Sequence, residues 1–392
     1  IILADDLGYG DLGSYGATRV QTPHTDRLAK EGRRFTDAHS PSSVCSPTRY
    51  GLLTGRYSWR TSLQRGVLDF PAPLHIEPSR LTTASLLKQH GYKTAAIGKW
   101  HLGYGLPPKA DYNQPLKPGP LEVGFDYHFG VPSNHGIAPN GYVENYELLG
   151  RKPGERITFA GNKVTKGLIE PRVDDLVNKT LTAKAVSFIE QNAGQPFFLY
   201  FTPVATHNPI TPAPEFRGKS QAGLYGDYIM ELDWCAGQVL ATLDRLKLAD
   251  NTLVIVSSDN GGVATNGATA EFPLNLSSDE GGKVRENHHL AQRDAAKAGH
   301  LINGSLRGRK HSIYEGGVRV PFLARWPGRV PTGTTSDETI CLTDMLATTA
   351  AMLGTKLPKN AGEDSYNILP ALLDKKLGKK LKQPIREATV LH

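Results

Sequence analysis

Four short apolar runs, each followed by charged or polar residues, most constrain how this chain can fold. Ile1 to Ala4 precedes a pair of aspartates, and Leu253 to Val256 precedes a Ser-Asp-Asn segment. Tyr92 to Ile97 and Pro196 to Phe201 lead into polar segments in the same way. Continuous apolar runs are typical of strands buried on both faces, and parallel strands bring their following loops to one edge of a sheet. The sequence therefore predicts an α/β fold with a mostly parallel sheet.

Helical patterns separate these apolar runs. The spacing predicts helices from Thr22 to Glu31, Thr82 to His90, Val173 to Asn192, Ile229 to Leu246 and Thr343 to Leu353. Threonine before the first two and glycine after them are typical helix boundaries. Further strands are expected from Arg33 to Ala38 and from Val318 to Ala324. Strands and helices that alternate in this order predict one large sheet covered on both faces.

The residues that follow the predicted strands form one candidate site, and some of them could hold a metal ion. They are Asp5 and Asp6, Lys99 and His101, His207, and Asp259 and Asn260. Three carboxylates and an amide are hard oxygen ligands, a set that favours Ca²⁺ or Mg²⁺ over zinc. The alternative is that the aspartates are caps scattered around the sheet, but clustered carboxylates without a cation would repel one another.

The segment from Ser42 to Arg56, S-S-V-C-S-P-T-R-Y-G-L-L-T-G-R, carries a candidate nucleophile. Pro47 suits a first helical turn, so we expect Cys45 at a helix N-terminus and Arg49 one turn further along the same face. The helix dipole and Arg49 would then acidify the thiol. The alternative interpretation is an ordinary buried cysteine beside a surface arginine.

Charge and cysteine content narrow the class of partner. The chain has 392 residues and a net charge of +7, which favours anionic partners. It has no zinc-finger spacing, RNP motif or basic amphipathic helix, so we expect no nucleic acid, and no apolar run is long enough for a membrane span. Arg49, Lys99 and Lys310 would face a sulfated or phosphorylated substrate. Three cysteines argue against a disulfide framework, so Cys235 and Cys341 are expected to be buried thiols.

Several segments resemble blocks of one family. C-S-P-T-R-x-x-L-L-T-G-R resembles the signature of the type I, formylglycine-dependent sulfatases of the alkaline phosphatase superfamily. The acidic pair before G-Y-G-D, the string G-K-W-H-L-G at 98–103 and G-F-D-Y at 124–127 resemble further blocks. The resemblance implies an alkaline phosphatase-like α/β fold, with a mostly parallel central sheet sandwiched by helices. It also implies a catalytic domain over 1–375, with a polar insertion at 263–303. Residues 376–392 would begin a small C-terminal antiparallel subdomain, most of which is missing from this chain.

The resemblance also implies a modified residue and a metal ion. In this family the motif directs oxidation of its cysteine, so Cys45 would become formylglycine through a maturation enzyme. Ca²⁺, or less favourably Mg²⁺, would be held by the hard ligands and by the modified residue: Asp5, Asp6, Asp259, Asn260 and Cys45.

The remaining site residues receive roles from the same resemblance. Arg49 and Lys99 would stabilise the formylglycine hydrate, and Lys99 would also contact the sulfate. His207 and Lys310 would act on the leaving alcohol oxygen. His101 would be the general base that triggers sulfate release, a task suited to an imidazole.

Two more histidines are candidate substrate-binding residues. His135 lies in a long stretch rich in Pro and Gly, and His300 lies in the polar insertion, which we expect at the pocket rim. A purely structural role is the alternative for each. Arg309 and His311 flank Lys310 where the family more often has glycine, so the shape of this loop is where the chain departs from the resemblance.

The sequence thus predicts an arylsulfatase-like enzyme, a sulfuric ester hydrolase that releases inorganic sulfate from a sulfate monoester. The basic chain and long polar loops favour a sulfated carbohydrate as the substrate. One alternative is a phosphonate or phosphodiester hydrolase of the same superfamily. Another is a non-catalytic, sulfated-glycan-binding pseudo-enzyme. We expect a periplasmic or secreted location, with the signal peptide outside this sequence.

Overall fold

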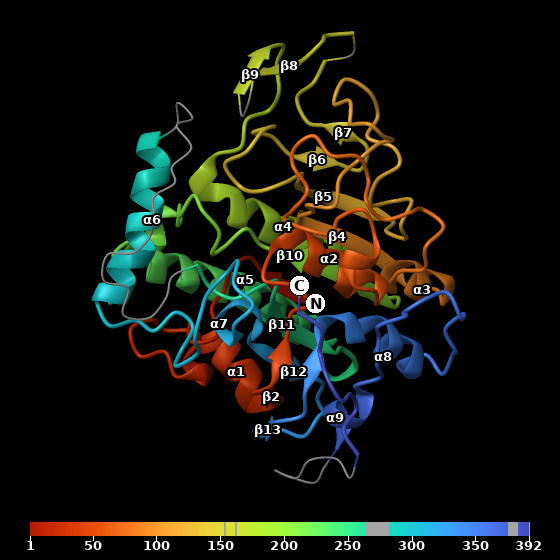
Figure 1. Ribbon diagram of the computed structural model, residues 1–392, viewed down its shortest axis with the longest axis vertical. Coiled ribbons are helices and arrows are strands. Elements are labelled where there is room, and N and C mark those ends of the chain that lie inside the picture. Colours follow the sequence, from red (N-terminus) through yellow and green to blue (C-terminus); the bar gives the residue numbers. More distant parts are fainter. Residues whose placement is uncertain (153, 161–162, 264–281, 375–382, 392) are drawn as a thin grey trace.

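A ten-stranded sheet forms the centre of the protein (Figure 1). The computed structural model describes residues 1–152, 154–160, 163–263, 282–374 and 383–391. The strands of this sheet are β1 (Ile2–Ala4), β2 (Arg33–Phe35), β4 (Lys93–Lys99), β5 (Tyr127–Val131), β6 (Val143–Glu144), β7 (Glu147–Leu148), β10 (Phe197–Thr202), β11 (Val254–Ser258), β12 (Phe322–Arg325) and β13 (Thr334–Ser336). Two further pairs are β3 (Ala38–His39) with β14 (Ile340–Cys341), and β8 (Thr158–Ala160) with β9 (Lys163–Lys166).

The strand order is β13-β2-β12-β11-β1-β10-β4-β5-β6-β7. The five middle strands, from β11 to β5, are parallel to one another, and β12 and β6 add antiparallel neighbours on either side. The predicted mostly parallel sheet is therefore confirmed. Since all five middle strands point the same way, the loops that follow them meet at one edge.

Helices cover both faces of this sheet. They are α1 (Pro23–Glu31), α2 (Cys45–Thr54), α3 (Thr83–Gln89), α4 (Val177–Gln191), α5 (Gly223–Arg245), α6 (Gly282–Lys297), α7 (Glu315–Val318), α8 (Met345–Met352) and α9 (Leu369–Leu373). Short 3-10 helices cover Gly13–Tyr15, Ser58–Arg60, Asp174–Leu176, Pro214–Phe216, Ala249–Asn251 and Leu342–Asp344. One core cluster joins the sheet to α1, α4 and α5, and another joins it to α2, α3 and α8.

Alternate residues of each central strand belong to different cores. In β1, Ile2 and Ala4 pack with α4 and α5, whereas Leu3 packs on the opposite side. In β10, Leu199 and Phe201 face the first core and Tyr200 the second. Both faces of a strand are thus apolar, which explains the unbroken apolar runs in the sequence.

The structure adds to the predictions or differs from them at several places, among them the following. The stretch 104–170, which shows weak periodicity, supplies β5, β6 and β7 to the central sheet. The strand expected from Val318 begins only at Phe322, because Glu315–Val318 forms the short helix α7. Residues 388–391 have irregular structure, and the N–H of Val390 donates to the hydroxyl of Tyr57.

Candidate active site

The carboxyl edge of two neighbouring strands gathers the predicted metal ligands. β1 ends directly before Asp5 and Asp6, and β11 ends directly before Asp259 and Asn260. All four residues are buried, with at most 1% of their surface exposed. The backbone N–H of Asp6 donates to Asp259 Oδ1 at 3.2 Å, which ties the two loops together. Three carboxylates and an amide that are far apart in sequence therefore lie together in space.

Helix α2 brings Cys45 into the same cluster. Cys45 is the first residue of the helix and Pro47 lies in its first turn, as predicted. The thiol Sγ lies 3.7 Å from Asp5 Oδ1 and 3.5 Å from Lys310 Nζ. Every residue of α2 is buried, and burial raises the pKa of the Cys45 thiol to about 12 despite the charges of Lys310 and Lys99. The expected acidification is wrong, because desolvation of the thiolate outweighs the nearby cations.

Each carboxylate of the cluster is paired with one buried cation. The pairs are Lys99 Nζ with both oxygens of Asp5 at 2.9 and 2.8 Å, Lys310 Nζ with Asp6 Oδ2 at 2.9 Å, and Arg49 Nε and Nη2 with Asp259 Oδ2 at 3.0 and 2.8 Å. Burial alone would raise the pKa of Asp5 and Asp6, but Lys99 beside Asp5 and Lys310 beside Asp6 outweigh it and hold both pKa values below their usual range. The three carboxylates and the three cations cancel in charge. An anionic ligand would therefore need a further cation beside it.

The donor set fits a hard divalent cation. Ligand atoms of Asp5, Asp6, Cys45 and His207 lie within 4.8 Å of one another. Asn260 Nδ2 donates to Asp6 Oδ1 at 2.8 Å, but Asn260 Oδ1 is buried and has no hydrogen-bond partner among the described residues. Leaving a buried acceptor unpaired costs about 1–3 kcal/mol, and a metal ion would satisfy it. Carboxylate and amide oxygens are the ligands that Ca²⁺ and Mg²⁺ prefer.

Two histidines reach this cluster from β4 and β10. His101 follows Lys99, is 2% exposed, and has Nε2 3.0 Å from the carbonyl oxygen of Leu68. Burial, with the charge of Lys99 beside it, holds the pKa of His101 well below its usual value. His207 Nε2 lies 3.8 Å from Asp6 Oδ2, and burial lowers the pKa of this ring too. Both imidazoles are therefore neutral near pH 7, the form that can accept a proton.

The two predicted substrate-binding histidines lie in the interior. His135 is 1% exposed, and its Nε2 lies 3.0 Å from Thr211 Oγ1. His300 is 2% exposed, and its Nε2 lies 2.7 Å from Asp11 Oδ1. His300 is thus buried and bound to a carboxylate and does not lie at an exposed rim, and its part in substrate binding stays a prediction. Within the predicted insertion, residues 264–281 lie outside the described part of the chain.

The sequence analysis missed the residues that fix the two acidic loops. The carboxylate of Asp11 accepts hydrogen bonds from the N–H of Gly8 and the hydroxyl of Tyr225, both at 2.7 Å. Asn303 Oδ1 accepts from the N–H of Gly262 at 2.8 Å, and Asn303 Nδ2 donates to the Gly262 carbonyl at 3.1 Å. Asp11 stands within the G-Y-G-D block and could have been suspected. Tyr225 and Asn303 carry no local pattern that would single them out.

These contacts define the class of protein. Hard metal ligands and three cations lie around one buried side chain at a helix N-terminus, at the carboxyl edge of a parallel sheet. Two neutral histidines lie among the same charged residues. This arrangement suits a metal-dependent hydrolase that acts on an anionic ester. Among the described residues, no helix has the length and apolarity needed to cross a membrane.

Comparisons with known proteins identify the family. A family model described as Sulfatase matches residues 1–355. The chain is 36% identical to an N-acetylgalactosamine-6-O-sulfatase of Bacteroides thetaiotaomicron, over 95% of this chain and 76% of that protein. It is 32% identical to the steryl-sulfatase of Rattus norvegicus, over 95% of this chain and 70% of that protein. The chain belongs to the sulfatase family, within the alkaline phosphatase superfamily, and is a sulfate ester hydrolase.

A solved structure gives the same result for the fold. It comes from work on the metabolism of multiple glycosaminoglycans by Bacteroides thetaiotaomicron and has a TM-score of 0.83 at 36% identity. The superposition covers 95% of this chain and 80% of that one. The similarity therefore extends over nearly the whole of the described sheet and its helices.

Proposed function

We propose that this chain hydrolyses a sulfate monoester of a carbohydrate and releases inorganic sulfate, using formylglycine made from Cys45 and a Ca²⁺ ion. The observation that carries the proposal is the position of the Cys45 side chain. Its Sγ lies within 3.7 Å of both Asp5, a candidate metal ligand, and Lys310, a candidate sulfate-binding cation. The similarity to an enzyme named for 6-sulfated N-acetylgalactosamine supports a sugar as the alcohol.

The raised pKa of the Cys45 thiol supports its conversion before catalysis. With a pKa of about 12, almost no thiolate is present at neutral pH, so the unmodified residue is a weak nucleophile. A formylglycine hydrate would supply an oxygen nucleophile with a second hydroxyl for regeneration, and Ca²⁺ would polarise the sulfate. Installation of formylglycine requires a maturation enzyme as a partner.

Three carboxylates and one amide of the two loops would hold the ion. These are Asp5, Asp6, Asp259 and Asn260, whose unpaired Oδ1 is a ready ligand. Ca²⁺ suits this cluster better than Mg²⁺, because Mg²⁺ demands near-octahedral geometry and usually retains several waters.

The surrounding side chains would divide the remaining tasks. Arg49 Nη1 donates to the carbonyl oxygen of Lys99 at 2.7 Å, so the two cations are held as one unit beside residue 45. They orient the nucleophile, and Lys99 also binds the sulfate. Lys310 and His207 act on the alcohol oxygen as it leaves, and His101, which is neutral, accepts the proton for sulfate release. His135 stays a candidate for substrate binding through its surrounding loop.

Three measurements test this proposal. Mass spectrometry of the peptide that contains residue 45 distinguishes formylglycine from cysteine. Sulfate release is then measured with 6-O-sulfated N-acetylgalactosamine and 4-nitrophenyl sulfate, beside bis(4-nitrophenyl) phosphate. We expect turnover of both sulfates, loss of turnover in chelator and recovery with Ca²⁺. Faster turnover of the phosphodiester would instead support the phosphodiesterase alternative. An unmodified Cys45 in native material, with no turnover, would support a sulfated-glycan-binding pseudo-enzyme.

Location and domain boundaries complete the proposal. We place the protein in the periplasm or outside the cell, as the resemblance implies, and fractionation of the native host tests this. We assign residues 1–375 to the catalytic domain and 376–392 to the start of a C-terminal subdomain. Limited proteolysis should then cut near residue 375 before it cuts within the central sheet.

A further inference from the structure

Backbone strain in this protein concentrates around the active site. Among the described residues, five that are not glycine have a positive φ: Asp6 (65°), His101 (55°), Asn145 (55°), Lys247 (58°) and His311 (71°). This region costs roughly 1–2 kcal/mol for most residues, and strained residues persist mainly where function requires them. Asp6 and His101 already have proposed roles. His311 is the third strained residue next to the site, and it has none.

His311 stands at the tip of a tightly held turn. The N–H of Ser312 donates to the Arg309 carbonyl at 2.9 Å, and the N–H of Arg309 donates to Ser312 Oγ at 3.0 Å. His311 is the third residue of this turn, a position that favours glycine or asparagine when φ is positive. Its own N–H donates to the carbonyl oxygen of Ser43 at 3.1 Å, two residues before Cys45. The turn is therefore fixed directly against the segment that carries the nucleophile.

The two central residues of the turn point to different surroundings. Lys310 is buried and reaches the cluster, with Nζ 3.5 Å from Cys45 Sγ. His311 is exposed, and its ring makes no hydrogen bond or ion pair with any described residue. Partial burial and the charge of Lys310 lower the pKa of His311, so the ring is neutral and suited to hydrogen bonding. Neither packing nor an internal contact explains why a histidine occupies this strained position.

We propose that His311 is a specificity-determining residue that hydrogen-bonds a hydroxyl or amide oxygen of the sugar that carries the sulfate. This inference rests on the proposed function, in which Lys310 and His207 act on the leaving alcohol oxygen. The alcohol part of the substrate must then lie beside Lys310. His311 is the next residue of the same turn, so it is placed to contact that part of the substrate. The 4-nitrophenyl group has no hydroxyl or amide group for this ring, whereas a sugar has several.

The test compares a sugar sulfate with an aryl sulfate in matched variants. His311→Gly removes the ring at a position where glycine has no strain, and His311→Asn keeps a hydrogen-bonding side chain that tolerates positive φ. We expect His311→Gly to lower kcat/KM for 6-O-sulfated N-acetylgalactosamine about tenfold, mainly through KM. Turnover of 4-nitrophenyl sulfate should stay within about twofold of wild type. His311→Asn should recover part of the loss, and the melting temperature of neither variant should fall.

Lys247→Gly is the matched control, because it relieves the strain of another positive φ at an exposed position beyond the end of α5. This variant should hydrolyse both substrates at the wild-type rate. Equal losses on both substrates in His311→Gly, or no loss on the sugar, would overturn the proposal.

Calorimetry keeps the inference testable apart from turnover. Binding of 6-O-sulfated N-acetylgalactosamine is measured in a Cys45→Ala background with and without His311→Gly. Weaker binding with His311→Gly supports the contact, and unchanged binding overturns it. If wild type hydrolyses neither sulfate, the proposed function fails, and the binding comparison still decides the role of His311.

Discussion

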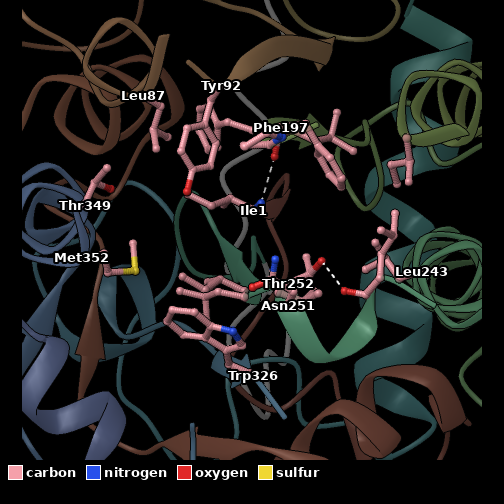
Figure 2. Close-up of a pocket in the computed structure, with 18 of the residues that line it drawn as sticks. Ile1, Leu87, Tyr92, Phe197, Leu243, Asn251, Thr252, Trp326, Thr349 and Met352 are labelled. Carbon is pink, nitrogen blue, oxygen red and sulfur yellow. Dashed lines mark hydrogen bonds between the residues drawn. The ribbon is translucent and has the colours of Figure 1, made fainter. Parts of the chain in front are cut away.

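The two edges of the central sheet differ in chemistry although the same strands form both. At the carboxyl edge, three buried carboxylates face three buried cations around Cys45. At the amino edge lies a cavity of about 620 Å³, with Ile1, Tyr92, Phe197, Trp326 and Met352 in its wall (Figure 2). The described residues that line this cavity include no acidic side chain. This cavity therefore lacks the carboxylate ligands that gather at the carboxyl edge.

This difference shows that the chemistry of the side chains locates the active site. Parallel strands bring their carboxyl-terminal loops to one edge, where polar side chains from distant segments can converge. At the amino edge, the cavity wall comes from strand starts and from apolar residues of helices such as Leu87 and Leu243. Substitutions at the carboxyl edge should therefore change turnover and the pairing of charges. Substitutions at the amino edge should change only the packing of apolar side chains.

The largest effect is expected for Cys45→Ala at the carboxyl edge. It removes the precursor of the nucleophile, so sulfate release should fall on the order of 10⁴-fold or more. The assay is hydrolysis of 4-nitrophenyl sulfate. Cys235→Ala is the matched control, because Cys235 is equally buried but lies in α5 within the apolar core. Substantial turnover in Cys45→Ala would show that residue 45 is not the reactive centre.

The second prediction concerns the charge balance of the cluster. Asp259→Asn keeps the shape of the side chain but leaves Arg49, which is fully buried, without its closest counter-charge. Breaking a buried pair in this way costs about 3–5 kcal/mol, which urea unfolding in chelator would measure. Stabilisation by added Ca²⁺ should also weaken, because a candidate ligand has lost its charge.

A surface ion pair provides the control for that prediction. Asp244 accepts a hydrogen bond from Arg27 Nη1 at 2.7 Å, and both side chains are more than a third exposed. Since exposed pairs contribute about 0–1 kcal/mol, Asp244→Asn should change the free energy of unfolding little. Similar losses in the two variants would mean that burial of the Asp259–Arg49 pair has no energetic consequence.

The same contrast shows how much of the fold the sequence predicted. The strands from Ile2, Lys93, Phe197 and Val254 were recognisable because both of their faces are apolar and they stand before polar loops. β5 was not, because it lies in a stretch rich in Pro and Gly and is recruited by pairing with β4. The local sequence pattern therefore predicts strands whose two faces are both buried in the core. It does not predict strands such as β5, which form because they pair with a neighbouring strand.

The candidate site shows a similar limit. Strand ends correctly indicated that Asp5, Asp6 and Asp259 would converge, since topology alone requires it. The pKa of Cys45 was expected in the wrong direction, because a helix dipole is a local property whereas burial depends on the whole fold. Asn303 was missed for the same reason, since its hydrogen bonds to Gly262 exist only in the folded chain.

The third prediction tests what burial does to a carboxyl group without a cation. Glu231 lies in α5, and its Oε2 accepts from the N–H of Ala213 at 3.0 Å, in the segment that follows His207. Its Oε1 has no hydrogen-bond partner among the residues described, and burial raises the pKa of Glu231 to about 8. Asp5 and Asp6 are equally buried, but their cations hold the pKa down.

The sign of the resulting pH dependence follows from linkage. In the unfolded chain, Glu231 loses its proton above its ordinary pKa of 4.5. In the folded chain, the raised pKa keeps it protonated up to a pH of about 8. Stability from this group is therefore complete below pH 4.5 and is lost as pH rises, by about 3 kcal/mol between pH 5 and 8. Glu231→Gln should be free of this loss, as urea unfolding across that range would show. Parallel pH curves for the two proteins would mean that Glu231 is ionised in the fold.

The smallest effect is expected at the amino edge. Met352 lines the cavity and is 37% exposed, so Met352→Ala removes little buried contact and should cost only about 1 kcal/mol of unfolding free energy. Turnover of 4-nitrophenyl sulfate should stay within about twofold of wild type, because none of the candidate metal ligands and none of Arg49, Lys99 and Lys310 lines this cavity. A change in KM with unchanged stability would contradict the comparison, since it would couple an apolar cavity at the strand starts to chemistry at the strand ends.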